Sequence, residues 1–210
     1  MTKLSKYNIP GHIHFVTTNV HNHLPLFAYR DICQMLIANL DYYRGKHRFK
    51  LLGYVIMPDH FHALIYSEGG VSIEKIVQDI KRYTAKQIRE RLLIGPVILS
   101  NQNDLIFSIK QLDKAMQTSA KRCLQKLGVI ELSSFQVDSP RTQGQEHIFW
   151  QESFYDFNVF TEVKLHEKLD YIHRNPLRWH LVEDPCDYPC SSYLNYYREG
   201  TDLPICIDFL

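Results

Sequence analysis

The pair of histidines His60 and His62 has the residue types and the spacing of a partial metal site. The pair follows the turn-forming run Met57-Pro-Asp59 and opens a segment rich in apolar and aromatic residues, which predicts a strand. Because side chains alternate between the two faces of a strand, both imidazoles are expected to point the same way. Two neutral imidazoles on one face still lack a third ligand.

A second group of polar residues lies on the helix that is predicted to begin after Thr161. Tyr171 lies about 120° around this helix from Leu165, away from its apolar stripe, at about 100° per residue. Asn175 follows four residues later and shares the face of Tyr171. A phenol is a poor nucleophile at its free pKa of about 10, so it needs cationic neighbours or a metal-polarised electrophile. The cationic neighbours on this helix are Lys164 and Lys168.

These two groups together predict a metal-assisted nucleophilic site. A divalent ion held by His60 and His62 would polarise a phosphate, and the side-chain carbonyl of Asn175 is a candidate third ligand. Imidazole and oxygen ligands with open positions suit Mg²⁺ or Mn²⁺ better than a structural zinc ion. Tyr171 would then be the nucleophile.

Other residues compete for the same roles. His12 and His14 form a second pair of the same spacing on the first predicted strand, but no Pro-Asp turn precedes them. Tyr155 is a rival tyrosine, although its aromatic surroundings favour packing. A histidine pair on a strand also has a purely structural interpretation, so the pair alone identifies no function.

The elements that must position these residues follow the order β-α-β-β-α, after which one further strand completes a split βαβ unit. This order predicts an α+β protein with a ferredoxin-like antiparallel sheet, helices on one face, and a C-terminal catalytic helix. Residues 96–145 are expected to form a helical insertion within a single domain that spans residues 1–210. The strands are expected at residues 13–18, 50–56, 60–66 and within 147–160, and the helices at 29–44, 73–92 and 161–175, the last ended by Asn175-Pro176.

Composition narrows the class of protein. The formal net charge is only +1, so any contact with nucleic acid must use local basic patches. Five cysteines form no paired framework, which favours a reducing compartment. No signal segment or membrane-spanning run is recognised, so a cytoplasmic protein with no membrane partner is expected.

Basic and aromatic residues provide candidate DNA contacts. The strongest candidate is Arg82, which shares a face of the second predicted helix with Lys75 and Lys86. Lysine-rich faces are usually solvated surfaces, but phosphate contacts need such groups. Trp150 is a candidate for stacking on unpaired bases, with core packing as the alternative.

Four segments, in this order, resemble the REP-associated tyrosine transposases, a branch of the HUH single-strand DNA transposases in the IS200-like superfamily. They cover most of the chain outside the insertion. The segments are Tyr54-Val-Ile-Met-Pro-Asp-His-Phe-His-Ala-Leu64, Phe149-Trp-Gln-Glu-Ser-Phe-Tyr-Asp156, Leu169-Asp-Tyr-Ile-His-Arg-Asn-Pro176 and Tyr188-Pro-Cys-Ser-Ser-Tyr193.

The resemblance implies a divalent metal bound by His60 and His62, a nucleophile at Tyr171 and assistance to the metal from Asn175. It implies cleavage and rejoining of structured single-stranded or hairpin DNA through a 5′-phosphotyrosine intermediate. The oligomeric state, monomer or homodimer, stays open. The insertion is larger than the family pattern leads one to expect. Two other functions stay open at this point: a domesticated DNA-binding protein with little cleavage activity, and a metal-dependent hydrolase without a covalent step.

Overall fold

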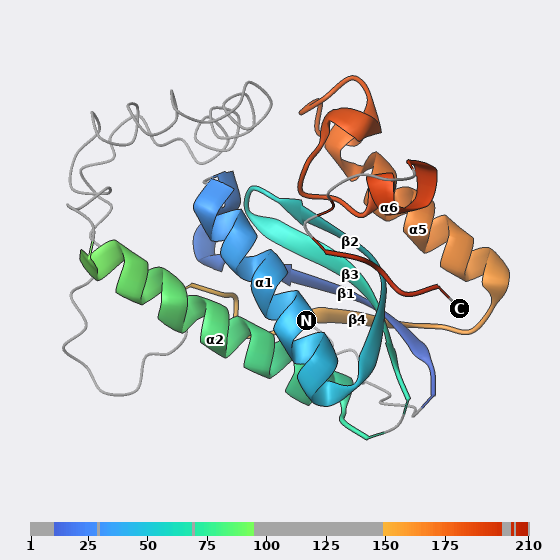
Figure 1. Cartoon of the computed structure of the whole chain (residues 1–210), viewed down its shortest axis with the longest axis horizontal. Helices are drawn as coiled ribbons and strands as arrows, with labels where there is room; N and C mark the ends of the chain where they lie inside the picture. The colour runs from blue at the N-terminus through green and yellow to red at the C-terminus, as the bar shows by residue number, and fades with distance from the viewer. Residues whose placement is uncertain are drawn as a thin grey trace.

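A four-stranded antiparallel sheet with strand order β2-β3-β1-β4 is the frame of the molecule (Figure 1). The computed structural model describes residues 11–28, 30–68, 70–94, 149–198, 203 and 205–209. The predicted insertion therefore lies outside the described residues. The strands are β1 (Ile13–Asn19), β2 (Phe49–Met57), β3 (His60–Ser67) and β4 (Tyr155–Val159).

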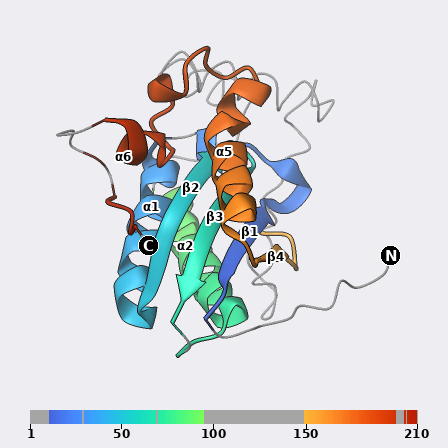
Figure 2. The same cartoon turned by 90° about the vertical axis from the view of Figure 1, so that its right-hand side faces the viewer.

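Helices cover both faces of this sheet. The helices α1 (Arg30–His47) and α2 (Ile73–Ile94) lie on one face, and α5 (Glu162–Arg178) lies on the other (Figure 2). This is the predicted α+β arrangement, with the C-terminal helix added opposite the two crossover helices. Short helical segments complete the described chain: η1 (His21–His23), η2 (Leu26–Ala28), η4 (Pro185–Asp187) and α6 (Tyr193–Tyr197). Among the described residues, no helix combines the length and the apolar character needed to span a bilayer.

Two helix ends differ from the sequence prediction. The helix α1 passes Gly45 and ends at His47, after which Arg48 adopts a left-handed backbone with φ of 54°. The helix α5 begins as predicted, with the hydroxyl of Thr161 accepting the backbone N–H of Lys164, but it continues through Pro176 to Arg178. A proline in the last turn removes only one backbone donor, so the helix survives it there.

Strand register decides which residues face α5. Thr17 of β1 lies opposite His62 of β3, and Asn19 lies opposite His60. Side-chain alternation therefore places both histidines on the face that α5 covers, whereas Phe61 points toward α1 and α2. The ring of Phe61 accordingly lies 5.8 Å from the ring of Trp150, inside the core of that opposite face.

The motif 188–193 pairs with the outer edge of β2. The Ile56 N–H donates to the Cys190 carbonyl at 2.8 Å, and the Ser192 N–H donates to the Tyr54 carbonyl at 2.9 Å. The hydroxyl of Tyr188 donates to the Ile56 carbonyl at 2.7 Å. This motif therefore acts as a short additional edge strand that provides hydrogen-bond partners for backbone groups of β2.

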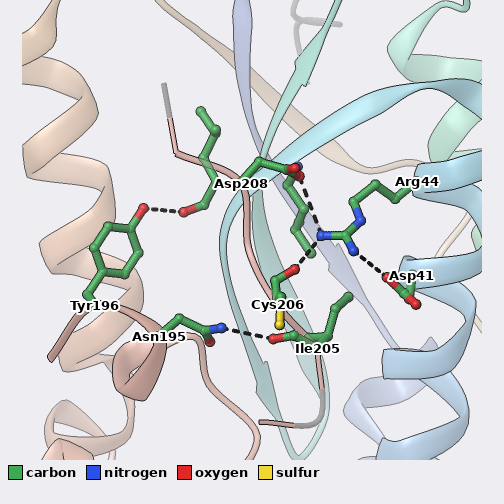
Figure 3. A network of polar contacts seen from close by, with 9 residues as sticks. Asp41, Arg44, Asn195, Tyr196, Ile205, Cys206 and Asp208 are labelled. Atoms are coloured by element: carbon green, nitrogen blue, oxygen red, sulfur yellow. Dashed lines mark hydrogen bonds and ion pairs between the residues drawn. The ribbon is translucent and has the colours of Figure 1, made fainter. Parts of the chain in front are cut away.

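The last described residues, 205–209, extend this edge (Figure 3). The Asp208 N–H donates to the Leu51 carbonyl at 2.9 Å, and the Leu51 N–H donates back to the Asp208 carboxylate at 2.9 Å. Arg44 of α1 donates to the Cys206 carbonyl and contacts Asp208. The C-terminal segment therefore ties α1 to the edge strand.

Gly53 sets how closely α5 approaches the sheet. A Cβ atom at this position would lie 2.7 Å from the Cδ1 atom of Leu169 and 3.5 Å from Ser192 Oγ. The missing side chain lets Leu169 pack directly on the backbone of β2.

Ser192→Ala is expected to destabilise the fold by about 1–3 kcal/mol, because the hydroxyl is buried and serves several partners. Its oxygen accepts the Tyr54 N–H at 2.9 Å and lies 3.0 Å from His173 Nε2. The free energy of unfolding in urea measures the effect. Ser191→Ala is the matched control, because the neighbouring Ser191 Oγ accepts the Tyr193 N–H at 3.1 Å and does not bond β2 or His173 in the way Ser192 does. Equal losses in the two variants would contradict this role of Ser192.

Candidate active site

The two histidines of β3 and the tyrosine of α5 lie against one another. The ring centroids of His60 and His62 are 4.8 Å apart, and the ring of Tyr171 lies 5.2 Å from that of His62. The predicted juxtaposition of the histidine pair with the helix of Tyr171 is therefore present. It arises because α5 covers the sheet face on which both histidines lie (Figure 2).

Each histidine is held through its Nδ1 atom. His60 Nδ1 lies 2.6 Å from Asp59 Oδ1, and His62 Nδ1 lies 2.7 Å from the hydroxyl of Thr17. When each Nδ1 carries the proton and donates it, each Nε2 keeps a free lone pair. The Nε2 atom of His62 is buried and has no hydrogen-bond partner.

Asn175 has a side-chain oxygen that is also buried without a hydrogen-bond partner. Its side chain is 1% exposed, and its Oδ1 atom is buried without a hydrogen-bond partner. Buried polar atoms are nearly always satisfied, and these two are among seven unpartnered buried side-chain atoms of the described residues. An imidazole nitrogen and an amide oxygen are both ligand types that a divalent cation with open positions accepts, and the ring of His60 lies 4.8 Å from that of His62. No group of three His, Cys, Asp or Glu residues suited to a metal occurs in the described part of the chain.

Burial keeps His62 in the neutral state that a metal ligand requires. Desolvation, followed by the charge of the neighbouring His60, holds the pKa of His62 well below its ordinary value, so this ring is neutral near pH 7. Burial raises the pKa of Asp59, but the hydrogen bonds from His60 and His23 outweigh burial and leave its pKa lowered. The residue that anchors His60 is therefore a carboxylate.

Tyr171 lies among aromatic and cationic side chains. Its ring is 5.8 Å from that of Phe15, edge to face, and the guanidinium carbon of Arg178 lies 5.0 Å from the ring centroid. Lys168 places its Nζ atom 4.8 Å from the Phe15 ring. Lys164 points elsewhere along the helix and pairs with Glu167 at 2.5 Å.

The basic residues predicted on α2 are not brought to this site. Arg82, Lys75 and Lys86 are exposed, but α2 lies on the sheet face opposite α5 (Figure 2). Lys75 pairs with Asp79 at 2.8 Å, and Arg82 lies 3.6 Å from the same carboxylate. A DNA substrate bound at Tyr171 could contact these residues only if it also reached the opposite face of the sheet.

Trp150 does not have the exposure that base stacking needs, and that prediction is wrong. The residue is 4% exposed, its ring lies 5.5 Å from that of Phe27, and its Nε1–H donates to the Lys81 carbonyl at 2.9 Å. Core packing, the alternative use of this side chain, is the one observed.

The competing histidines lie apart from the histidine pair, whereas the rival Tyr155 lies opposite Thr17 in the sheet. His14 points to the other sheet face, where its Nδ1 atom lies 2.9 Å from Asp156 and both side chains are 1% exposed. The ring of His12 lies 5.2 Å from Phe160. Tyr155 is 44% exposed at the edge of the sheet and touches Phe15.

Sequence reasoning missed several residues that complete the site. Asp59 precedes the first histidine, and its role depends on the turn that folds its carboxylate back to His60. Thr17 comes from a distant strand, and only the register of β1 against β3 places it beside His62. Trp179, whose ring lies 5.7 Å from that of His60, follows Pro176 and was beyond the predicted helix end.

Comparisons with known proteins bear on the fold and on the N-terminal part of the sequence. Residues 5–95 match the family model described as "Transposase IS200 like". No curated protein matches the chain. A solved structure described as "Structure of the REP associates tyrosine transposase bound to a REP hairpin" is similar to it, with a TM-score of 0.58 and 17% identity, over 99% of this chain and 93% of that one. At this identity the likeness shows the fold, which is the predicted one.

The stability of the folded chain is expected to fall as the pH drops from about 6.5 to about 4 because of His173. Burial is the main cause that lowers the pKa of His173 to about 4 from its ordinary 6.5. Within this window the unfolded chain takes up a proton that the folded chain does not, which costs up to about 3 kcal/mol of stability. Urea unfolding at several pH values measures the slope, and it should be shallower in His173→Gln. An unchanged slope in that variant would contradict this assignment.

Proposed function

We propose that this chain, whose residues 5–95 match the family model described as "Transposase IS200 like", is a metal-dependent tyrosine enzyme that cleaves and rejoins structured single-stranded DNA. The observation that carries the proposal is the contact between Tyr171 and His62, whose ring centroids lie 5.2 Å apart. Asn175, one turn further along α5, is buried, and its Oδ1 atom has no hydrogen-bond partner. These contacts support a nucleophile on α5 that acts next to a metal-binding histidine of β3.

The residues that would hold the cation are His60, His62 and Asn175. When bound, a divalent ion such as Mg²⁺ or Mn²⁺ supplies positive charge that polarises a phosphate oxygen. The chain contributes the neutral state of His62, the anchoring of each imidazole through Nδ1, and the exclusion of water by burial.

Tyr171 would attack the phosphorus atom of a phosphodiester. The bond between Tyr171 Oη and phosphorus forms as the bond between phosphorus and the 3′-oxygen breaks, and the phenolic proton is transferred to a base or to that oxygen. The products are a 5′-phosphotyrosine and a free 3′-hydroxyl, so the energy of the phosphodiester is kept and a second 3′-hydroxyl can reverse the step. Arg178 and Lys168 lie where their charges favour the anionic phosphate.

The DNA partner is proposed to be a single strand that folds into a hairpin. The similar solved structure is described as bound to a REP hairpin, and that description concerns the other protein. In this chain, Lys168 and Arg178 flank Tyr171 and can contact the backbone near the cleaved bond. Lys164, at 47% side-chain exposure one turn before Lys168, is a more peripheral contact.

Tyr171→Phe should abolish the covalent product while leaving the fold intact, because the change removes only a hydroxyl. The assay incubates hairpin-bearing single-stranded DNA with Mn²⁺ and detects a denaturant-resistant protein–DNA adduct on a gel. Tyr155→Phe is the matched control, because Tyr155 is the exposed tyrosine next to the same Phe15 ring. The control should form adduct as the unsubstituted chain does.

Two results of that assay would overturn the mechanism. Strand cleavage that survives Tyr171→Phe would indicate a hydrolase without a covalent step. DNA binding with neither cleavage nor adduct in the unsubstituted chain would indicate a DNA-binding protein that has lost the reaction.

His62→Ala should remove the dependence on the metal together with the activity. The adduct should fall below detection at Mn²⁺ concentrations that saturate the unsubstituted chain, because the orphaned Nε2 atom is lost. His14→Ala is the control, since it removes an equally buried imidazole from the opposite sheet face. If the two variants lose adduct in equal measure while both remain folded by circular dichroism, His62 has no special role in the site.

A further inference from the structure

A chain of three side chains leads from the surface to the histidine pair. His23 Nδ1 lies 2.8 Å from Asp59 Oδ2, and Asp59 Oδ1 lies 2.6 Å from His60 Nδ1. The side chain of His23 is 54% exposed, whereas those of Asp59 and His60 are 6% and 8% exposed. Both oxygens of one buried carboxylate are thus occupied by imidazoles, one at the site and one at the surface.

The loop backbone at Asn22 and His23 places the His23 side chain next to Asp59. Asn22 and His23 both adopt left-handed backbone conformations, with φ of 53° and 54°, which residues other than glycine seldom adopt. Backbone hydrogen bonds fix the loop to the turn before β3: the Val20 N–H donates to the Asp59 carbonyl at 2.8 Å, and the Phe27 N–H donates to the Pro58 carbonyl at 2.9 Å. The loop after β1 therefore holds His23 over Asp59 at a cost in backbone strain.

The carboxylate decides which nitrogen of His60 can act as a ligand. A free neutral histidine exchanges its proton between Nδ1 and Nε2, and only the form with the proton on Nδ1 offers Nε2 as a ligand. An acceptor at Nδ1 selects that form and fixes the orientation of the ring. Asp59 is such an acceptor for His60, whereas the hydroxyl of Thr17 beside His62 can either accept or donate.

We propose that Asp59 and His23 are positioning residues of the site, with Asp59 fixing the tautomer and ring orientation of His60 and His23 fixing the carboxylate of Asp59. Neither residue touches the reacting atoms. The part of this proposal that concerns metal affinity rests on the proposed function, whereas the part that concerns the tautomer stands without it.

The first test reads the tautomer without any metal. Two-bond ¹⁵N–¹H correlation spectra of the metal-free chain, with His60 assigned by comparison with His60→Gln, should show the proton of His60 on Nδ1. In Asp59→Asn the signals should shift toward the Nε2–H form or toward exchange between the two. His60 found in the Nε2–H form in the unsubstituted chain would overturn the proposal.

The second test titrates Mn²⁺ alone and follows the free ion by electron paramagnetic resonance. Asp59→Asn should weaken Mn²⁺ binding roughly 10-fold or more, as the loss of such anchoring residues does elsewhere. Asp156→Asn is the matched control, because Asp156 is also buried and bonded to a histidine Nδ1, that of His14 at 2.9 Å, on the opposite sheet face. The control should bind Mn²⁺ as the unsubstituted chain does.

The role of His23 is tested in the same way with a neighbour as control. His23→Ala should weaken Mn²⁺ binding by a smaller factor than Asp59→Asn, and His21→Ala, at an exposed histidine of the same turn, should have no effect. Equal Mn²⁺ affinity in Asp59→Asn and Asp156→Asn would overturn the positioning role. If the unsubstituted chain binds no Mn²⁺, the proposed function fails, and the tautomer spectra still decide whether Asp59 positions His60.

Discussion

Everything in the site depends on the packing of α5 against the sheet face that carries His60 and His62. Gly53 lets Leu169 reach the backbone of β2, and this close approach sets the distance between helix and sheet. From there α5 carries Tyr171 to the ring of His62 and buries Asn175. The hydroxyl of Ser192, which bonds both β2 and His173 of α5, holds the same interface by polar contacts.

This interface also carries an energetic cost. The Nε2 atom of His62 and the Oδ1 atom of Asn175 are buried without partners, and each orphaned polar group of this kind disfavours folding by about 1–3 kcal/mol. A chain that needed only stability would place apolar side chains there. The orphaned atoms are explained if a cation completes them, and the edge motif 188–193 together with residues 205–209 supplies stabilising contacts elsewhere.

Alternation and helical phase were enough to predict which faces of the strand and the helix carry the candidate site residues. They placed His60 and His62 on one face and Tyr171 with Asn175 on another, and the order of elements predicted the sheet that brings the two faces together. Thr17 required the strand register, and Asp59 required the folded turn, neither of which is written in local spacing. The aromatic-rich sequence around Trp150 likewise did not show whether this side chain is buried or exposed, because core packing and base stacking both use aromatic residues. Nor did a basic stripe reveal that α2 covers the face opposite the site, since that depends on the topology of the crossovers.

The measurement that tests the central claim most directly is the identification of the residue that carries DNA after reaction. The chain would be incubated with a hairpin-bearing single strand and Mn²⁺, digested with nuclease and protease, and sequenced by tandem mass spectrometry. The account predicts a nucleotide remnant on the peptide that contains Tyr171, attached through a 5′-phosphate. A remnant on Tyr155 or on any other residue, or cleaved DNA with no modified peptide, would contradict it.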